Sequence, residues 1–214
     1  EGEYNLDLAA FFRKVGGGGA AYTPAPLKLP VQPMAREQAA TAIARVGGSL
    51  DESFWIAHPG MGGSALNLSI DSYVRLLDDL EKKIPGPLYL TMGPAPRDLQ
   101  WVEGVVDQRP HWRVFPRVGI TALAEVYRAA RLVVAPSTGP LHLAHYVGTK
   151  TLGIFSPVRS QQASRWAPWG GAGESLILAP EHPCPGKRDC LGTRCPRYFC
   201  LDKLTLSPGL LASV

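Results

Sequence analysis

The amino-acid sequence predicts an α/β fold, a Rossmann-like parallel sheet of about six strands flanked by helices. Three observations lead to this prediction. Short apolar runs, typical of strands buried on both faces, alternate with longer segments that have helical periodicity. Turn-forming Gly, Pro, Ser or Thr residues separate these segments. Residues 131–156, RLVVAPSTGPLHLAHYVGTKTLGIFS, contain a complete strand–turn–helix–strand unit, and such units join parallel strands through right-handed crossovers.

Each expected strand is a short apolar run beside a turn signal, and each expected helix has its apolar residues on one face. The expected strands are residues 53–57, 87–92, 112–115, 132–135, 151–155 and 174–178. The expected helices are residues 36–46, 70–84, 97–106, 122–130 and a segment that begins near Pro140. Thr121 is expected to cap the helix at 122–130. Ser137 and Thr138 are expected to cap the helix near Pro140, which Gly148 ends.

Two segments lie outside this alternation. Residues 4–15 have a helical pattern, and the four glycines and Pro-rich stretch that follow predict an extended linker. Residues 183–200 are rich in Pro, Gly, Cys and Arg, which predicts irregular structure, and residues 207–214 predict a short closing helix. We therefore divide the chain into a linker region at 1–33, a Rossmann-like domain at 34–182 and a Cys-rich tail at 183–214.

Composition narrows the class of protein. The 214 residues are 45% hydrophobic and 19% charged, which is typical of a globular protein. No apolar run approaches the roughly 18 residues that a membrane span needs. No cysteine lies outside residues 184–200, which argues against a disulfide-framed secreted protein, so we expect a cytoplasmic location. The net charge of +4 suits an anionic small ligand or an anionic membrane surface, and it does not call for nucleic acid as a partner.

Two turns have the chemistry of anion sites. The turn at Ser137, Thr138 and Gly139 follows a buried strand and opens a helix, so backbone N–H groups and the positive end of the helix dipole converge there. The second turn, HPGMGGS at residues 58–64, has three glycines that would let backbone N–H groups form a nest for a diphosphate. Capping alone, or an ordinary Gly-rich turn, would explain either motif, but together they predict a phosphate site.

The segment STGPLHLAHYVGTKTLGIFSP resembles the signature of glycosyltransferase family nine, the ADP-heptose:lipopolysaccharide heptosyltransferases, and HPGMGGS resembles the first donor loop of that family. The resemblance implies the C-terminal, nucleotide-sugar-binding domain of a GT-B enzyme, with residues 1–33 joining it to an acceptor domain that this chain lacks. It implies sugar transfer from ADP-heptose or a similar donor to a hydroxyl of a glycan or lipid-linked acceptor, as in lipopolysaccharide biosynthesis. Inversion without a catalytic metal, and peripheral contact with the inner membrane, are further implications.

The resemblance also implies a set of site residues. The expected donor-binding residues are Gly60, Gly62, Gly63, Ser64, Ser137, Thr138, Gly139, Pro140, Leu141 and His142. Topology places Met92, Gly93, Phe115 and Pro116 near the nucleotide base and ribose, with Asp98 as a more distant partner of the ribose. His142 is expected to act electrostatically on the leaving diphosphate. The catalytic base belongs to the missing domain, so the isolated chain should bind donor without turnover.

Two departures from the family pattern support a different class of function. Ser137 stands where the signature usually has Asp, and residues 65–68 lack the basic residue of the first loop, which Arg159 or Arg165 would have to replace. A non-catalytic module with a degenerate donor site would explain both changes. A sugar-nucleotide epimerase would need carboxylates near the donor, and neither turn contains one.

All four cysteines lie in the tail, as Cys184-x5-Cys190-x4-Cys195-x4-Cys200. This spacing leaves three states open: a structural metal site holding Zn or Fe, unpaired thiols, or disulfides. In the non-catalytic alternative, such a metal would staple the tail into an interaction surface. Lys187, Arg188, Arg194 and Arg197 lie between and beside these cysteines, either as a solvated basic loop or as a contact for an anionic acceptor or membrane.

Overall fold

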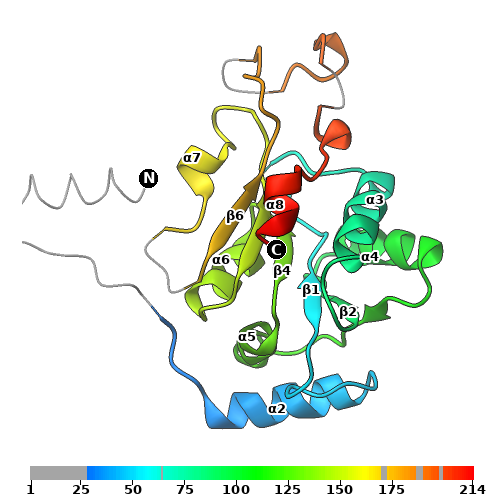
Figure 1. Cartoon of the computed structure of the whole chain (residues 1–214), viewed down its shortest axis with the longest axis vertical. Coiled ribbons are helices and arrows are strands. Elements are labelled where there is room, and N and C mark those ends of the chain that lie inside the picture. Colours follow the sequence, from blue (N-terminus) through cyan, green and yellow to red (C-terminus); the bar gives the residue numbers. More distant parts are fainter. Residues whose placement is uncertain (1–27, 64, 170–172, 187–189, 198–199) are drawn as a thin grey trace, which may run out of the picture.

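A computed structural model describes residues 28–63, 65–169, 173–186, 190–197 and 200–214 of the protein. The expected helix at 4–15 and the glycine run lie outside these residues, as does Ser64. The predicted fold is confirmed, because six parallel strands form one sheet in the order β3-β2-β1-β4-β5-β6, with helices on both faces (Figure 1). The strands are β1 (Trp55–Ala57), β2 (Leu88–Leu90), β3 (Arg113–Val114), β4 (Val133–Pro136), β5 (Thr151–Ile154) and β6 (Ser175–Leu178).

The helices bury opposite faces of this sheet. They are α2 (Pro33–Ala44), α3 (Ile70–Glu81), α4 (Pro96–Gln108), α5 (Ile120–Ala129), α6 (Gly139–Tyr146), α7 (Ala163–Trp166) and α8 (Pro208–Ala212), with 3-10 turns η1 (Gly192–Arg194) and η2 (Leu201–Lys203). Successive strand residues point to opposite faces, so Trp55 and Ala57 of β1 pack with α3 and α4, whereas Ile56 packs with α2, α5 and α6. In the part of the chain that the structure describes, no helix is long and apolar enough to cross a membrane.

Most predicted elements form within a few residues of their expected bounds, and the helix ends show the differences. Helix α5 begins at Ile120 with Gly119 at its N-cap, so Thr121 lies inside the helix and the expected cap is wrong. Thr138 does occupy the N-cap of α6, but its hydroxyl donates to the carbonyl of Pro136 at 3.1 Å and does not bond the helix. Gly148 ends the segment as expected, with φ of 94°.

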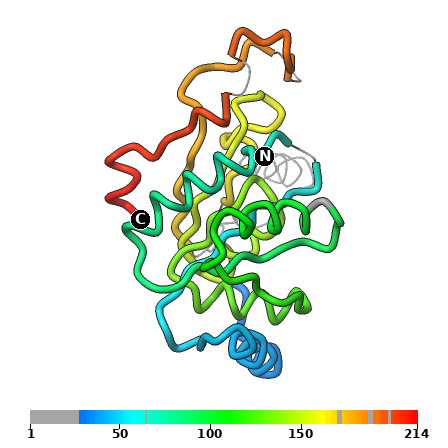
Figure 2. The backbone as a smooth tube through the Cα atoms, turned by 90° about the vertical axis from the view of Figure 1, so that its right-hand side faces the viewer, coloured from blue at the N-terminus to red at the C-terminus, as the bar shows by residue number. Residues whose placement is uncertain are grey.

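The irregular tail returns across the face of α3. Its last residues run beside that helix (Figure 2), and the side chains of Leu204, Leu206 and Leu210 join the core on this face. The carboxylate of Asp202 accepts a hydrogen bond from the N–H of Ser69 at 2.8 Å, directly before α3 begins. The tail is therefore anchored at the N-terminus of α3.

A second anchor holds the segment that leads into α2. The guanidinium of Arg128 donates to the carbonyl of Leu29 at 2.8 Å and to the carbonyl of Val147 at 2.9 Å. It also pairs with Glu125 at 3.3 Å, and the side chains of this arginine and glutamate are only 13% and 1% exposed. The other carboxylate oxygen of Glu125 accepts from the N–H of Gln32 at 3.2 Å. This buried ion pair ties residues 29–32 to α5 and α6.

Candidate functional site

The two predicted phosphate turns line one cleft of about 550 Å³, which we call the main cleft. Residues Gly60, Met61 and Gly62 follow β1, and Thr138, Gly139 and Pro140 open α6 after β4. Strands β1 and β4 are neighbours in the sheet, so the turns that follow their carboxyl ends lie beside each other. Met92, Gly93, Phe115 and Pro116 line the same cleft from the ends of β2 and β3.

Asp98 lies between two of these loops. A Cβ on Gly60 would stand 2.7 Å from Oδ1 of Asp98, and a Cβ on Gly93 would overlap with Oδ2, so both positions need glycine for this close approach. The side chain is 5% exposed, yet Oδ1 has no hydrogen-bond partner among the described residues. Asp98 sits in the first turn of α4, where the helix dipole favours a negative charge. This oxygen is therefore available to accept a hydrogen bond from a ligand.

Three buried polar side chains form a row that begins at the wall of the main cleft, which His58 and Thr91 line. Nδ1 of His58 lies 3.0 Å from the hydroxyl of Thr91, which in turn lies 3.2 Å from the hydroxyl of Tyr127. Burial lowers the pKa of His58 to about 4, although the nearby charge of Asp98 opposes this shift. Burial also raises the pKa of Tyr127. Both groups are therefore neutral at physiological pH, and they position the loops that follow β1 and β2.

The pKa of His58 predicts a loss of stability in mild acid. His58 binds a proton near pH 6.5 in the unfolded chain and only near pH 4 in the folded chain. With respect to this group, the folded state therefore has its full stability above pH 6.5 and loses stability as the pH falls from 6.5 towards 4. Lowering the pH from 7.5 to 4.5 should cost about 2–3 kcal/mol of unfolding free energy through this group. Urea titrations at several pH values would measure it. His58→Gln should flatten the dependence, apart from the share of His142 and His145, whose pKa values burial also lowers. An equally steep dependence in the variant would contradict this assignment.

A smaller hollow of about 300 Å³, the side hollow, lies on the other side of the α6 turn and shares Thr138 and Gly139 with the main cleft. Its wall combines several polar side chains with apolar surface that includes one indole ring. The remaining lining residues are Ala65, Ser137, His142, Ser160, Gln161 and Trp166. The indole N–H of Trp166 donates to the carbonyl of Ser160 at 2.7 Å, which fixes a ring that is 43% exposed. Burial lowers the pKa of His142, so its imidazole is neutral.

The structure corrects part of the predicted site. The side chain of Leu141 is fully buried against Ala135 and Phe155, and it lines neither the main cleft nor the side hollow. The N–H groups of Leu141 and His142 donate to the carbonyl of Thr138 at 3.1 and 3.4 Å. These two groups were expected to be free for an anion, and they are not.

Gly63 has φ of 84°, the left-handed conformation that glycine adopts freely.

Several residues that line the main cleft were not expected from the sequence. Arg117 lines the main cleft beside Pro116 and supplies a positive charge there, whereas Arg159 and Arg165 do not line it. Thr91 follows a buried strand directly, and a polar residue at that place is the signal that could have identified it. The four cysteines line a separate hollow beside the tail, and all four are free thiols.

Comparisons with known proteins agree with this fold. The sequence model described as glycosyltransferase family 9 (heptosyltransferase) matches residues 28–192. One relative is a Haemophilus influenzae protein that is named as a glycosyltransferase by assignment. It is 26% identical over 181 residues, which is 84% of this chain and 52% of that protein.

Two solved structures show the same fold at low identity. One is a family 9 glycosyl transferase from Veillonella parvula, with a TM-score of 0.61, 16% identity, and coverage of 75% of this chain and 45% of that one. The other is the E. coli heptosyltransferase WaaC solved with ADP, with a TM-score of 0.50, 16% identity, and coverage of 65% and 42%. This chain thus spans about half the length of these relatives.

Proposed function

The chain belongs to glycosyltransferase family 9, and on that premise we propose that its main cleft binds the nucleoside diphosphate part of a nucleotide-sugar donor. The observation that carries this proposal is the convergence of both glycine-bearing turns with the ends of β2 and β3 in one cleft. A nucleoside diphosphate needs an anion site and an apolar slot side by side. The WaaC structure contains ADP, which favours an adenine nucleotide as the first ligand to test.

Each part of the nucleotide has a matching wall. The diphosphate would lie at Gly139, where the positive end of α6 meets the loop at Gly60 and Gly62. Arg117 would add a positive charge to this region. The base would pack on the apolar wall formed by Met92, Phe115 and Pro116, and the unpartnered oxygen of Asp98 would accept a ribose hydroxyl.

The side hollow would hold the sugar that is transferred. A ligand whose diphosphate spans the α6 turn passes from the main cleft into the side hollow, because both share Thr138 and Gly139. The lining of the side hollow offers a hydroxyl from Ser137, a neutral imidazole from His142 and the indole of Trp166. Hydrogen-bonding groups beside an aromatic face are the usual means of binding a sugar ring.

The proposed chemistry divides between two domains. The acceptor hydroxyl would attack the anomeric carbon from the face opposite the diphosphate, and its proton would pass to a base in the preceding domain of the whole enzyme. The bond to the diphosphate would break, and the diphosphate would leave with the bonding electrons. The α6 turn would stabilise that developing charge through the helix dipole. This chain alone would therefore bind donor without transferring sugar.

Gly139→Val tests the cleft directly. A Cβ on Gly139 meets nothing within 4 Å, so the larger side chain should fit without loss of stability while it projects into the space proposed for the diphosphate. Calorimetric titration with ADP, UDP, GDP and CDP should find at least one ligand of the wild-type chain. We expect the variant to bind that ligand about tenfold more weakly, a cost of about 1.4 kcal/mol.

Gly209→Val is the matched control, because a Cβ there also meets nothing within 4 Å and α8 lies outside the cleft. It should keep the affinity of the wild-type chain. If none of the four nucleotides binds, or if Gly139→Val binds as tightly as wild type, the assignment of the main cleft is wrong. If a nucleotide does bind, comparing it with its glucose conjugate in wild type and in Trp166→Ala would test the side hollow separately.

A further inference from the structure

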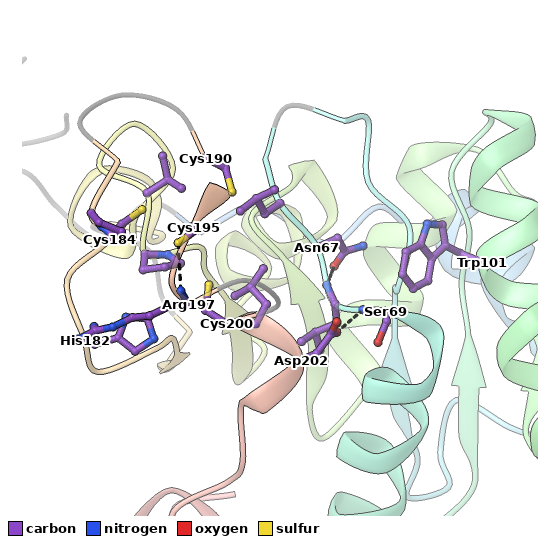
Figure 3. A pocket seen from close by; sticks show the side chains of 16 residues that line it. Asn67, Ser69, Trp101, His182, Cys184, Cys190, Cys195, Arg197, Cys200 and Asp202 are labelled. Carbon is purple, nitrogen blue, oxygen red and sulfur yellow. Dashed lines mark hydrogen bonds between the residues drawn. The ribbon is translucent and has the colours of Figure 1, made fainter. Parts of the chain in front are cut away.

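The four cysteines of the tail converge on one hollow of about 350 Å³, which we call the cysteine hollow. Cys184, Cys190, Cys195 and Cys200 all line it, although 15 residues of chain lie between the first and the last. Figure 3 shows the four side chains gathered around one space, with His182 at its edge. The cysteine hollow lies apart from the main cleft and shares no lining residue with it.

Backbone N–H groups already point at two of the sulfur atoms. The N–H of Gly192 donates to Sγ of Cys190 at 3.3 Å, and the N–H of Arg197 donates to Sγ of Cys195 at 3.4 Å. In both cases the donor lies two residues after the cysteine, so the two turns have the same local geometry. Hydrogen bonds of this kind orient the ligand atoms of metal sites. Thiolate is the form that binds a metal.

A histidine and an arginine stand beside the four thiols. Nδ1 of His182 is buried without a hydrogen-bond partner among the described residues. Four thiols around one hollow supply the soft sulfur donors that a thiophilic metal ion prefers. Arg197 also lines the cysteine hollow and would offset part of the remaining negative charge.

We propose that Cys184, Cys190, Cys195 and Cys200 together bind one thiophilic divalent metal ion, of which zinc is the type, as a structural site. The two four-residue spacings fall in the range seen in zinc sites, and the five-residue spacing lies just beyond it. Each thiol loses its proton to solvent as its bond to the metal forms, so binding releases protons and strengthens as pH rises.

Binding requires the thiols to move closer together. Among the described residues, no three His, Cys, Asp or Glu side chains lie in metal-binding geometry. The segment that carries the cysteines has only η1 as a regular element between Cys184 and Cys200, in the residues that the structure describes. A chain with so few regular hydrogen bonds can rearrange at low cost, and metal binding and local folding are coupled in such sites.

The site would order more than the tail. Leu66 and Ser69, which follow the glycine-rich turn after β1, line the cysteine hollow. Asp202, two residues after Cys200, accepts a hydrogen bond from the N–H of Ser69. A metal that fixes Cys200 would therefore hold the anchor between the tail and α3. This role is independent of nucleotide binding, because the main cleft has none of these residues in its wall.

The test uses the whole reduced chain. After purification under reducing conditions, mass spectrometry should find about one zinc per chain. Metal-free protein titrated with Co²⁺ should show thiolate-to-cobalt charge transfer and the visible bands of tetrahedral cobalt, saturating at one equivalent. Zinc should displace the cobalt and raise the melting temperature. Each single Cys→Ser variant should lose about a quarter of the charge-transfer intensity, because one of four thiolates is removed.

Thr193→Ala is the matched control, since Thr193 is exposed within η1 between two of the cysteines. It should keep the full spectrum and the zinc content of the wild-type chain. The proposal is overturned if the wild-type chain holds no zinc and binds no stoichiometric cobalt. It is also overturned if the thiolate-to-cobalt charge transfer keeps its full intensity in two of the Cys→Ser variants. Because the wild-type titration is decisive alone, a variant that fails to fold does not leave the question open.

Discussion

Asp98→Asn is expected to weaken nucleotide binding 10- to 100-fold while leaving the chain as stable as before or more stable. The wild-type carboxyl group has a buried oxygen without a partner, so it contributes little to the folded state and is available to a ligand. Hydrogen bonds to charged groups contribute about 1.5–3 kcal/mol, which corresponds to this range of affinity. An amide of the same shape keeps the fit against Gly60 and Gly93 but removes the charge.

Calorimetry with the preferred nucleoside diphosphate and urea unfolding would measure both quantities. Asp71→Asn is the control, because Asp71 is also an acid in the first turn of a helix, but it is exposed and lies outside the main cleft. A 2′,3′-dideoxyribose analogue of the nucleotide should bind wild type and Asp98→Asn equally. Unchanged affinity in Asp98→Asn, or a loss as large for the dideoxy analogue, would refute the role of Asp98 at the ribose.

Arg128→Ala should lower the free energy of unfolding by about 3–5 kcal/mol, the cost of leaving a buried charge without its partner. Glu125 is 1% exposed, and the guanidinium of Arg128 is its ion-pair partner. The same guanidinium holds the carbonyls of Leu29 and Val147, which would lose their donors. Urea unfolding followed by circular dichroism would measure the loss.

Two further variants separate the buried charge from simple truncation. Arg131→Ala removes an exposed arginine close by in the sequence and should change stability by less than about 0.5 kcal/mol. The double variant Glu125→Leu with Arg128→Leu should lose less stability than Arg128→Ala alone, because neither charge remains buried. An Arg128→Ala chain as stable as Arg131→Ala would mean that the ion pair contributes little to the fold.

The sheet could be predicted from the sequence because its strands are buried on both faces. Residues 132–135 and 151–155 are continuous apolar runs, and such runs between turn signals indicate parallel strands directly. Strand β3 was harder to place. Only Arg113 and Val114 form it, both exposed at the edge of the sheet, so its pattern differs little from that of a loop. The N-cap of α5 was also hard to predict, because both Thr121 and Gly119 are residues that can occupy an N-cap and they lie only two positions apart.

The candidate site was predicted in outline and missed in its depth. Glycine-bearing turns are local motifs, so the sequence indicates them and topology brings them together. Asp98 lies five positions after Gly93 and was expected only as a distant partner of the ribose, yet the first turn of α4 folds it back against that glycine. Trp166 and Arg117 carry no local signal, because their place in a wall depends on how separate loops pack.

The shared wall at Thr138 and Gly139 has an evolutionary consequence. One short backbone segment faces both compartments, so substitutions there would disturb the recognition of nucleotide and of sugar together. The outer walls have no residue in common: Asp98 and Phe115 face one compartment, and Gln161 and Trp166 face the other. If the two compartments bind nucleotide and sugar as proposed, the two preferences could diverge separately, each by mutation of its own outer wall around an unchanged segment at Thr138 and Gly139.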